Sequence, residues 1–168
     1  MLALLALAAS TLSACTPTPE PTPTPTAAFA SEEEAFAAAE EVYRDYMEAF
    51  NLVDLRDPST FDPLFQYSTG EYLSSEKESL SQLHAEGRLR GGAIKIVSFE
   101  GIDYTSSDSV EAITCNDVSE TTFTDSEGSN LVPEDRPDRY ALILNFIVVD
   151  SALVIESAAP TEDPACAS

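Results

Sequence analysis

Residues 16–26, with the sequence TPTPEPTPTPT, place five prolines at every second position. Proline has no backbone N–H to donate and its ring fixes φ, so this segment can neither form a regular helix nor pair within a sheet. We therefore expect an extended spacer, at about 3.1 Å per residue. The fold must be built from the residues that follow, and the length of the chain predicts a single domain over 31–168.

An apolar stretch, LALLALAASTL, precedes the spacer at residues 2–12. It is too short for a helix that crosses a bilayer, but it suits the apolar core of a secretion signal. We predict a signal peptide over 1–14 that is removed from the mature chain. No Lys or Arg precedes the stretch, as a usual signal would have, which is consistent with a natural start upstream of Met1.

The end of this signal, Leu12-Ser13-Ala14-Cys15, resembles the lipobox of bacterial lipoproteins at all four positions. In that family the cysteine is acylated through its sulfur and becomes the first mature residue. The resemblance implies that Cys15 carries a lipid, that 15–30 is a lipidated tether, and that the protein is anchored to the extracytoplasmic face of the cell membrane. The alternative is an ordinary secretion signal with a chance cysteine.

The composition is strongly acidic, with 30 acidic and 8 basic residues and a net charge of −22. Because phosphate binding requires clustered Lys and Arg, this charge argues against nucleic acid as a partner. The charge would also repel an anionic membrane surface, so a covalent anchor is a sensible means of attachment. We interpret the acidity as a source of solubility rather than as a cation site.

The three cysteines predict one cross-link. With Cys15 assigned to the lipid, Cys115 and Cys166 remain as a pair in an oxidising compartment, where disulfides form. Metal binding by two cysteines without a nearby histidine is the weaker alternative. We expect a Cys115–Cys166 disulfide, and no metal ion or cofactor.

The domain changes from helical to strand periodicity along the chain. A capping-box spacing at Ser31 and Glu34 begins a long helix, a short helix is predicted around 59–67, and a third over 71–85. The long helix is expected to bury Phe36, Ala39, Tyr43, Tyr46 and Phe50, with Val42 and Met47 widening this face. Four β-rich segments follow, at 93–105, 109–120, 139–149 and 152–158. Three helices followed by four strands predict an α+β fold.

This order of elements resembles the NTF2-like cone, in which about three N-terminal helices pack against a curved antiparallel sheet of about four strands. Short motifs in the same order also resemble small actinobacterial lipoproteins of uncharacterised function. They are the segments 115–119 (CNDVS), 125–128 (DSEG) and 132–137 (VPEDRP), and the terminal Cys166. One departure is that the last strand of that family begins with tryptophan, whereas residues 150–153 read DSAL.

A cone of this type encloses a hollow, so both a binding module and an enzyme fit the fold. The candidate pocket-lining residues are the helix aromatics and the sole histidine: Tyr43, Tyr46, Phe50, Tyr72 and His84. We interpret the aromatic residues of the long helix first as part of the hydrophobic core. We interpret His84 as a charge partner at the end of its helix rather than as a general base. No Gly-rich phosphate loop, Ser-His-Asp set or zinc spacing occurs, so no catalytic residue is assigned.

Two further polar segments have more than one interpretation. Residues 125–130 (DSEGSN) lack the alternating ligands of a calcium loop, and we predict a hairpin turn there. Arg88, Arg90 and Lys95 form a basic cluster that could receive an anion, but a helix-cap and strand-edge role is favoured.

We therefore expect a lipid-anchored, non-catalytic module that binds a small ligand or an envelope protein. The alternative is a small-molecule enzyme of the isomerase, dehydratase or hydrolase type that uses the cone cavity. A third hypothesis is a homodimer paired through the outer face of the sheet.

Overall fold

The computed structural model describes residues 28–105 and 109–166. The predicted signal peptide over 1–14, Cys15 and most of the tether over 15–30 therefore lie outside the described residues. Within the described ranges, no helix combines the length and the apolar character that a membrane crossing requires.

The long helix α1 (Glu32–Leu52) begins where the sequence predicts. The Ser31 side chain accepts a hydrogen bond from the Glu34 backbone N–H at 3.1 Å. Glu34 in turn accepts the backbone N–H of Ala30 at 2.9 Å, one residue before the position of an ideal capping box. The capping pair thus fixes the start of α1, and its acidic first turn suits the positive end of the helix dipole.

The helix predicted around 59–67 is divided into η1 (Pro58–Thr60) and α2 (Asp62–Phe65). Each of the two contains a proline in its first turn, as the sequence suggests. The third helix, α3 (Gly70–Ala85), agrees with the prediction over 71–85.

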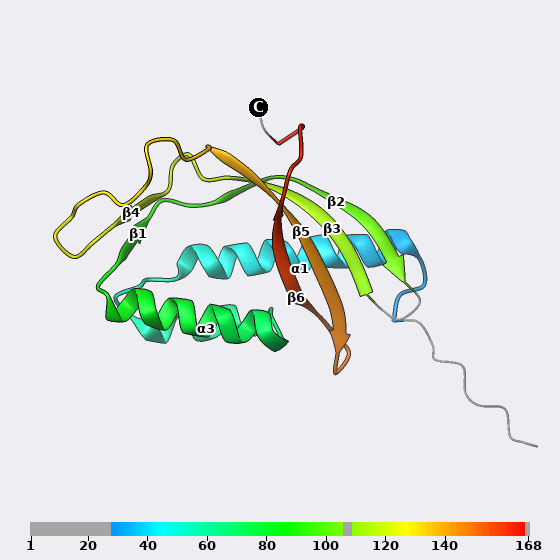
Figure 1. The fold of residues 1–168 in the computed structure, drawn as a ribbon. Coiled ribbons are helices and arrows are strands. Elements are labelled where there is room, and N and C mark those ends of the chain that lie inside the picture. The colour runs from blue at the N-terminus through cyan, green and yellow to red at the C-terminus, as the bar shows by residue number, and fades with distance from the viewer. Residues whose placement is uncertain (1–27, 106–108, 167–168) are drawn as a thin grey trace, which may run out of the picture.

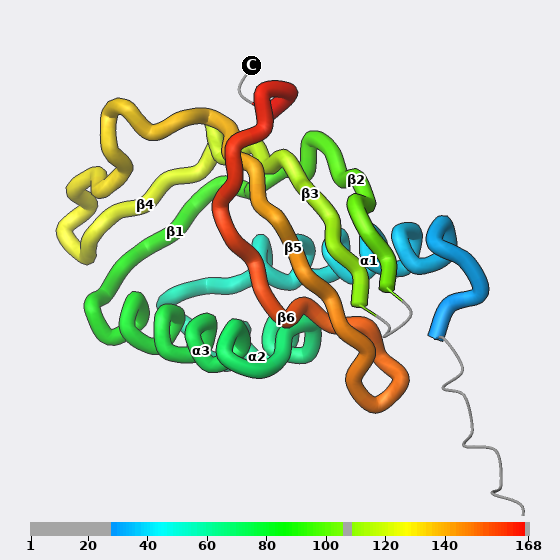
Figure 2. Tube along the Cα trace, turned by 45° about the vertical axis from the view of Figure 1, so that its right-hand side comes forward, coloured from blue at the N-terminus to red at the C-terminus, as the bar shows by residue number. Residues whose placement is uncertain are grey.

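The four predicted strands form one antiparallel sheet in the order β2-β3-β5-β6. Their bounds are β2 (Lys95–Thr105), β3 (Ser109–Asp117), β5 (Arg139–Val149) and β6 (Ala152–Thr161). The sheet curves over α1, and α3 lies on the same side of it (Figures 1 and 2). The predicted α+β class, with three helical segments against a curved antiparallel sheet, is confirmed.

A second, two-stranded sheet was not predicted. It pairs β1 (Leu89–Gly91) with β4 (Thr122–Thr124) in antiparallel register. Both strands have only three residues, which is too short for a clear alternating pattern. The pair extends the fold beyond the end of α1, on the left of Figure 1.

The core lies between α1 and the inner face of the sheet. On that face, Ala112 pairs with Leu144 and Val110 pairs with Phe146, and all four are buried. The expected buried face of α1 is largely present, although two of its aromatic residues are only half-buried. Ala39, Tyr43, Tyr46 and Met47 are buried, as expected, and Phe36, Val42 and Phe50 are half-buried. Ala35, which was not predicted, is buried as well.

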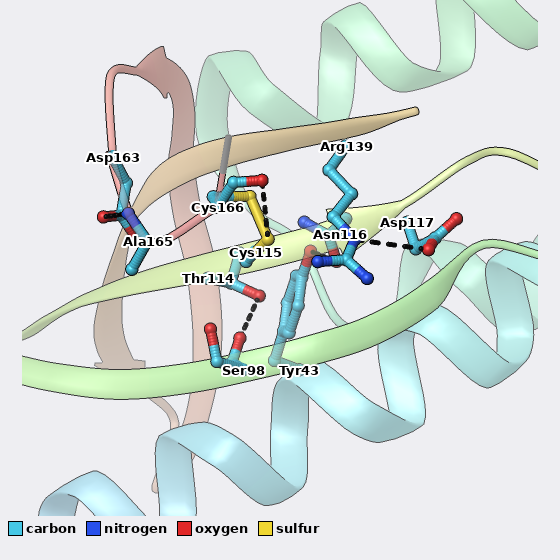
Figure 3. The surroundings of a disulfide bond; sticks show 10 residues. All are labelled: Tyr43, Ser98, Thr114, Cys115, Asn116, Asp117, Arg139, Asp163, Ala165 and Cys166. Carbon is cyan, nitrogen blue, oxygen red and sulfur yellow. Dashed lines mark hydrogen bonds and ion pairs between the residues drawn. A yellow bond between two sulfur atoms is a disulfide. The ribbon is translucent and has the colours of Figure 1, made fainter. Parts of the chain in front are cut away.

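The predicted Cys115–Cys166 disulfide is present on the outer face of the sheet (Figure 3). The two Cα atoms are 5.4 Å apart, and both cysteines are buried beside Ala141, which pairs with Cys115 across β3 and β5. The disulfide therefore fastens the C-terminal segment to the middle of the sheet.

Residues 125–130 form a turn, as predicted. The Asp125 carboxylate accepts the backbone N–H groups of Glu127 and Ser129, and Gly128 has a φ of +87°, which favours glycine. Thr124 and Asn130 then form an antiparallel bridge, so the chain reverses at this point.

Candidate functional site

Four polar side chains meet between α1, α3 and the start of β6. The Tyr46 hydroxyl donates to Glu76 Oε1 at 2.7 Å and lies 3.0 Å from the Tyr72 hydroxyl. The Ser68 hydroxyl donates to the other oxygen of Glu76. We call these four residues, Ser68, Tyr46, Tyr72 and Glu76, the tyrosine–glutamate cluster.

Local structure explains how the cluster is positioned. Tyr72 and Glu76 are four residues apart on α3, so they share one face of that helix. Ser68 precedes α3 and is held against β6, because the backbone groups of Tyr67 and Thr69 both bond to Ile155. Tyr46 reaches the cluster from the buried face of α1. The cluster therefore joins three elements that are distant in sequence.

Burial dominates the electrostatics of the cluster. It raises the pKa of Glu76, and the hydroxyl bonds from Ser68 and Tyr46 only partly oppose this. Burial also raises the pKa of Tyr72 to about 12 and that of Tyr46 further. Both tyrosines are thus protonated at neutral pH. When Glu76 is ionised, Tyr46 uses its single hydrogen to bond Glu76, so Tyr72 must donate to Tyr46.

A second buried contact links α1 to the sheet. The Tyr43 hydroxyl donates to Asn116 Oδ1 at 3.1 Å, and Figure 3 shows this ring pointing from α1 toward β3. Asn116 is fully buried, and within the described residues its Nδ2 has no hydrogen-bond partner. Burial raises the pKa of Tyr43, and the neighbouring Tyr140 adds to the effect.

The structure brings together four of the five residues expected to line a pocket. Tyr43, Tyr46 and Tyr72 all lie in the interior between the helices and the sheet. Phe50 stacks beside Tyr46, with ring centroids 6.2 Å apart. His84 lies apart from them in the last turn of α3, where its Nδ1 is 2.7 Å from the carbonyl oxygen of Leu55.

Glu76 and Ser68 were not selected from the sequence. The four-residue spacing of Tyr72 and Glu76 was a usable signal, because it places a carboxylate beside an aromatic hydroxyl on one helix face. Neither their contact with Tyr46 nor the position of Ser68 could be read from spacing, because the partners come from different elements.

The basic cluster has the structural role that we favoured. Arg88 pairs with Glu86 at 2.9 Å and Lys95 with Glu120 at 2.7 Å. Arg90 donates to the backbone carbonyl oxygens of Phe50 and Val53. It therefore caps the end of α1, rather than the end of the helix that immediately precedes it in sequence.

Four pockets of about 380 to 470 Å³ open on the surface. One lies between the end of α1 and the β1–β4 pair, and another beside the disulfide, where Tyr140 and Cys166 are among the lining residues. The other two share Leu52, at the end of α1. None of these four pockets is lined by Tyr43, Tyr46, Tyr72 or His84.

Neither a scan against protein-family models nor a search of curated proteins gives a match to the chain. Solved structures are similar in fold. The intermembrane space region of the chloroplast protein ARC6 is 12% identical with a TM-score of 0.54, over 76% of this chain and 97% of that chain. A "putative aromatic ring hydroxylase" from Novosphingobium aromaticivorans is 10% identical with a TM-score of 0.52, over 78% and 96%.

An NTF2-like protein of unknown function from Exiguobacterium is also similar, at 10% identity and a TM-score of 0.42, over 73% of this chain and 99% of that chain. The two stronger likenesses show a shared fold, which unrelated functions can use, so function has to be argued from residues.

Proposed function

We propose that this protein is a lipoprotein anchored through Cys15 to the extracytoplasmic face of the cell membrane, of the actinobacterial type that its motifs resemble. The Cys115–Cys166 disulfide supports an extracytoplasmic location, because disulfides persist in oxidising surroundings and are rare in the cytosol. The lipobox supplies the anchor, and the proline-rich spacer separates the domain from the head groups.

We further propose that the domain binds a small ligand or an envelope protein without catalysis. The observation that carries this proposal is that no residue of the tyrosine–glutamate cluster lines any of the four pockets described above. A general base must lie within hydrogen-bond reach of its substrate. The surface pockets, in contrast, have volumes typical of small-molecule sites.

The anchor is tested by Cys15→Ser. This variant should move from the membrane fraction to the medium and stop incorporating labelled fatty acid, because the thioether can no longer form. Ser13→Ala keeps a small residue before the cysteine and is the matched control that should stay in the membrane. Retention of the Cys15→Ser protein in the membrane would show that the lipid assignment is wrong.

One observation favours the alternative, an isomerase-, dehydratase- or hydrolase-type enzyme. The chain of hydroxyls from Tyr72 through Tyr46 to Glu76 could carry a proton, and raised carboxyl pKa values are typical of general acids. Tyr72→Phe should abolish turnover of a small molecule, without lowering the melting temperature, only if this alternative is right. His84→Asn is the control, because His84 lies outside the cluster.

The homodimer hypothesis also stays a prediction. It is tested by sedimentation velocity of the purified protein across a range of concentrations. A monomer at every concentration would contradict pairing through the outer face of the sheet.

A further inference from the structure

Leu52, the last residue of α1, is 71% exposed, more than any other large hydrophobic residue in the described part of the chain. One of the two pockets that it lines lies between α1 and the η1–α2 segment and has a volume of about 470 Å³. This volume is within the range of small-molecule sites. We call it the α1–α2 pocket.

One wall of the α1–α2 pocket is a single face of α1. Asp45, Glu48, Ala49 and Leu52 all line it, and their spacing of three, four and seven residues from Asp45 places them on the same side of the helix. The two carboxylates come first, and the apolar residues follow one turn later. At a rise of 1.5 Å per residue, this wall runs about 10 Å from an acidic end to an apolar end.

The opposite wall adds apolar surface but no cation. Pro63 and the ring of Tyr67 line it together with Thr60 and Gln66. The Thr60 hydroxyl is used by the fold, because it donates to the Asp57 carbonyl oxygen at 2.7 Å. The Gln66 amide likewise donates to the carbonyl oxygen of Pro63 at 2.9 Å. The carboxylates of the first wall are therefore the strongest polar groups that the pocket offers.

These carboxylates are accessible and unpaired. Asp45 and Glu48 are both exposed, and neither forms an ion pair within the described ranges. No Lys or Arg lines the α1–α2 pocket, whereas each of the other three pockets described above includes at least one arginine. Charge complementarity therefore favours a cationic occupant, and the apolar end of the pocket favours one with an apolar body.

We propose that the α1–α2 pocket binds a small primary amine with an apolar body. The ammonium group donates hydrogen bonds to the carboxylates of Asp45 and Glu48, and the apolar body lies against Leu52 and Pro63. An ammonium group has three donors, so one cation can serve both carboxylates through charge-assisted bonds. The inference rests on the proposed ligand-binding role and names the class of ligand.

NMR titration of the ¹⁵N-labelled full chain tests the site, with phenethylamine as the cationic probe and 2-phenylethanol as its neutral counterpart of similar size. Changes in amide chemical shift should concentrate in residues 45–52 and 60–67, which include both walls. Phenethylamine should bind about fivefold or more tightly than 2-phenylethanol, because only the cation pairs with the two exposed carboxylates.

Three variants separate charge from apolar contact. Glu48→Gln should weaken phenethylamine binding about threefold and leave 2-phenylethanol binding unchanged. Glu33→Gln is the matched control and should change neither, because it makes the same charge change about 18 Å earlier along α1 and lines none of the four pockets. Leu52→Ala should weaken both probes about twofold, and its exposure means that the core stays intact.

The proposal is overturned if millimolar phenethylamine shifts no amide in these two segments, or if 2-phenylethanol binds equally well. It is also overturned if Glu33→Gln weakens phenethylamine binding as much as Glu48→Gln, because the effect would then come from the general negative charge of the chain. Tighter binding of a Lys-Leu peptide amide to the same segments would overturn the small-amine assignment in favour of a protein partner. None of these results alters the Cys15 fractionation or the Tyr72→Phe turnover assay, so failure here is distinguishable from failure of the proposed function.

Discussion

Removal of the Cys115–Cys166 disulfide should lower the free energy of unfolding by about 4 kcal/mol. The two cysteines are 51 residues apart, and the chain-entropy model gives this value for a closed loop of that length. The bond acts mainly by lowering the conformational entropy of the unfolded chain, because it keeps Cys166 close to Cys115. The loss is large, because domains of this size are stable by only about 5–15 kcal/mol.

The change is made as Cys115→Ala with Cys166→Ala, in a Cys15→Ser background that removes the third thiol. Urea denaturation followed by circular dichroism gives the free energy, and the melting temperature should fall by about 10–20 °C. Reducing agent provides the matched control. It should destabilise the disulfide-bonded parent by a similar amount and leave the double variant unchanged.

The reduced parent protein retains both cysteine side chains beside Ala141. The difference between its free energy of unfolding and that of the double variant therefore measures the contribution of cysteine packing alone. A total loss below about 1 kcal/mol, or a further effect of reducing agent on the double variant, would refute the reasoning. The first result would mean that the unfolded chain is already compact, and the second that the measured effect does not come from this bond.

Two other changes test the interior. Glu76→Gln should become more stable relative to wild type as pH rises from about 4.5 toward neutral. The raised pKa of Glu76 means that the fold favours the protonated carboxyl group, so wild type loses stability as this group ionises. At low pH, where the carboxyl is protonated, the two proteins should differ little in stability. Urea midpoints measured across this range should diverge, and parallel profiles would contradict the raised pKa. Gly101→Ala should cost about 1–3 kcal/mol, because a Cβ there would lie 2.2 Å from the Phe36 ring. In thermal melts Gly101→Ala should cost less in a Phe36→Ala background, which lacks the ring carbons that the Cβ would meet, and an unchanged cost would mean that the clash lies elsewhere.

Local sequence signals determined the long helices and the four strands of the main sheet. Ser31 and Glu34 fixed the start of α1, the Asp-Pro pairs at 57–58 and 62–63 marked η1 and α2, and the predicted segment 139–149 coincides with β5. The Cys115–Cys166 pairing was also predictable, because parity leaves one partner once Cys15 is assigned. These features depend on residue type and short spacing, which the sequence states directly.

Tertiary structure alone decided how the polar interior is assembled. Tyr46 and Glu76 are 30 residues apart, and Tyr43 and Asn116 are 73 apart, so no periodic pattern relates them. The β1–β4 pair and the capping of α1 by Arg90 likewise depend on where the chain returns after a turn. Periodicity shows which face of an element is buried, but which partner meets that face is set by the packing of helices against a curved sheet.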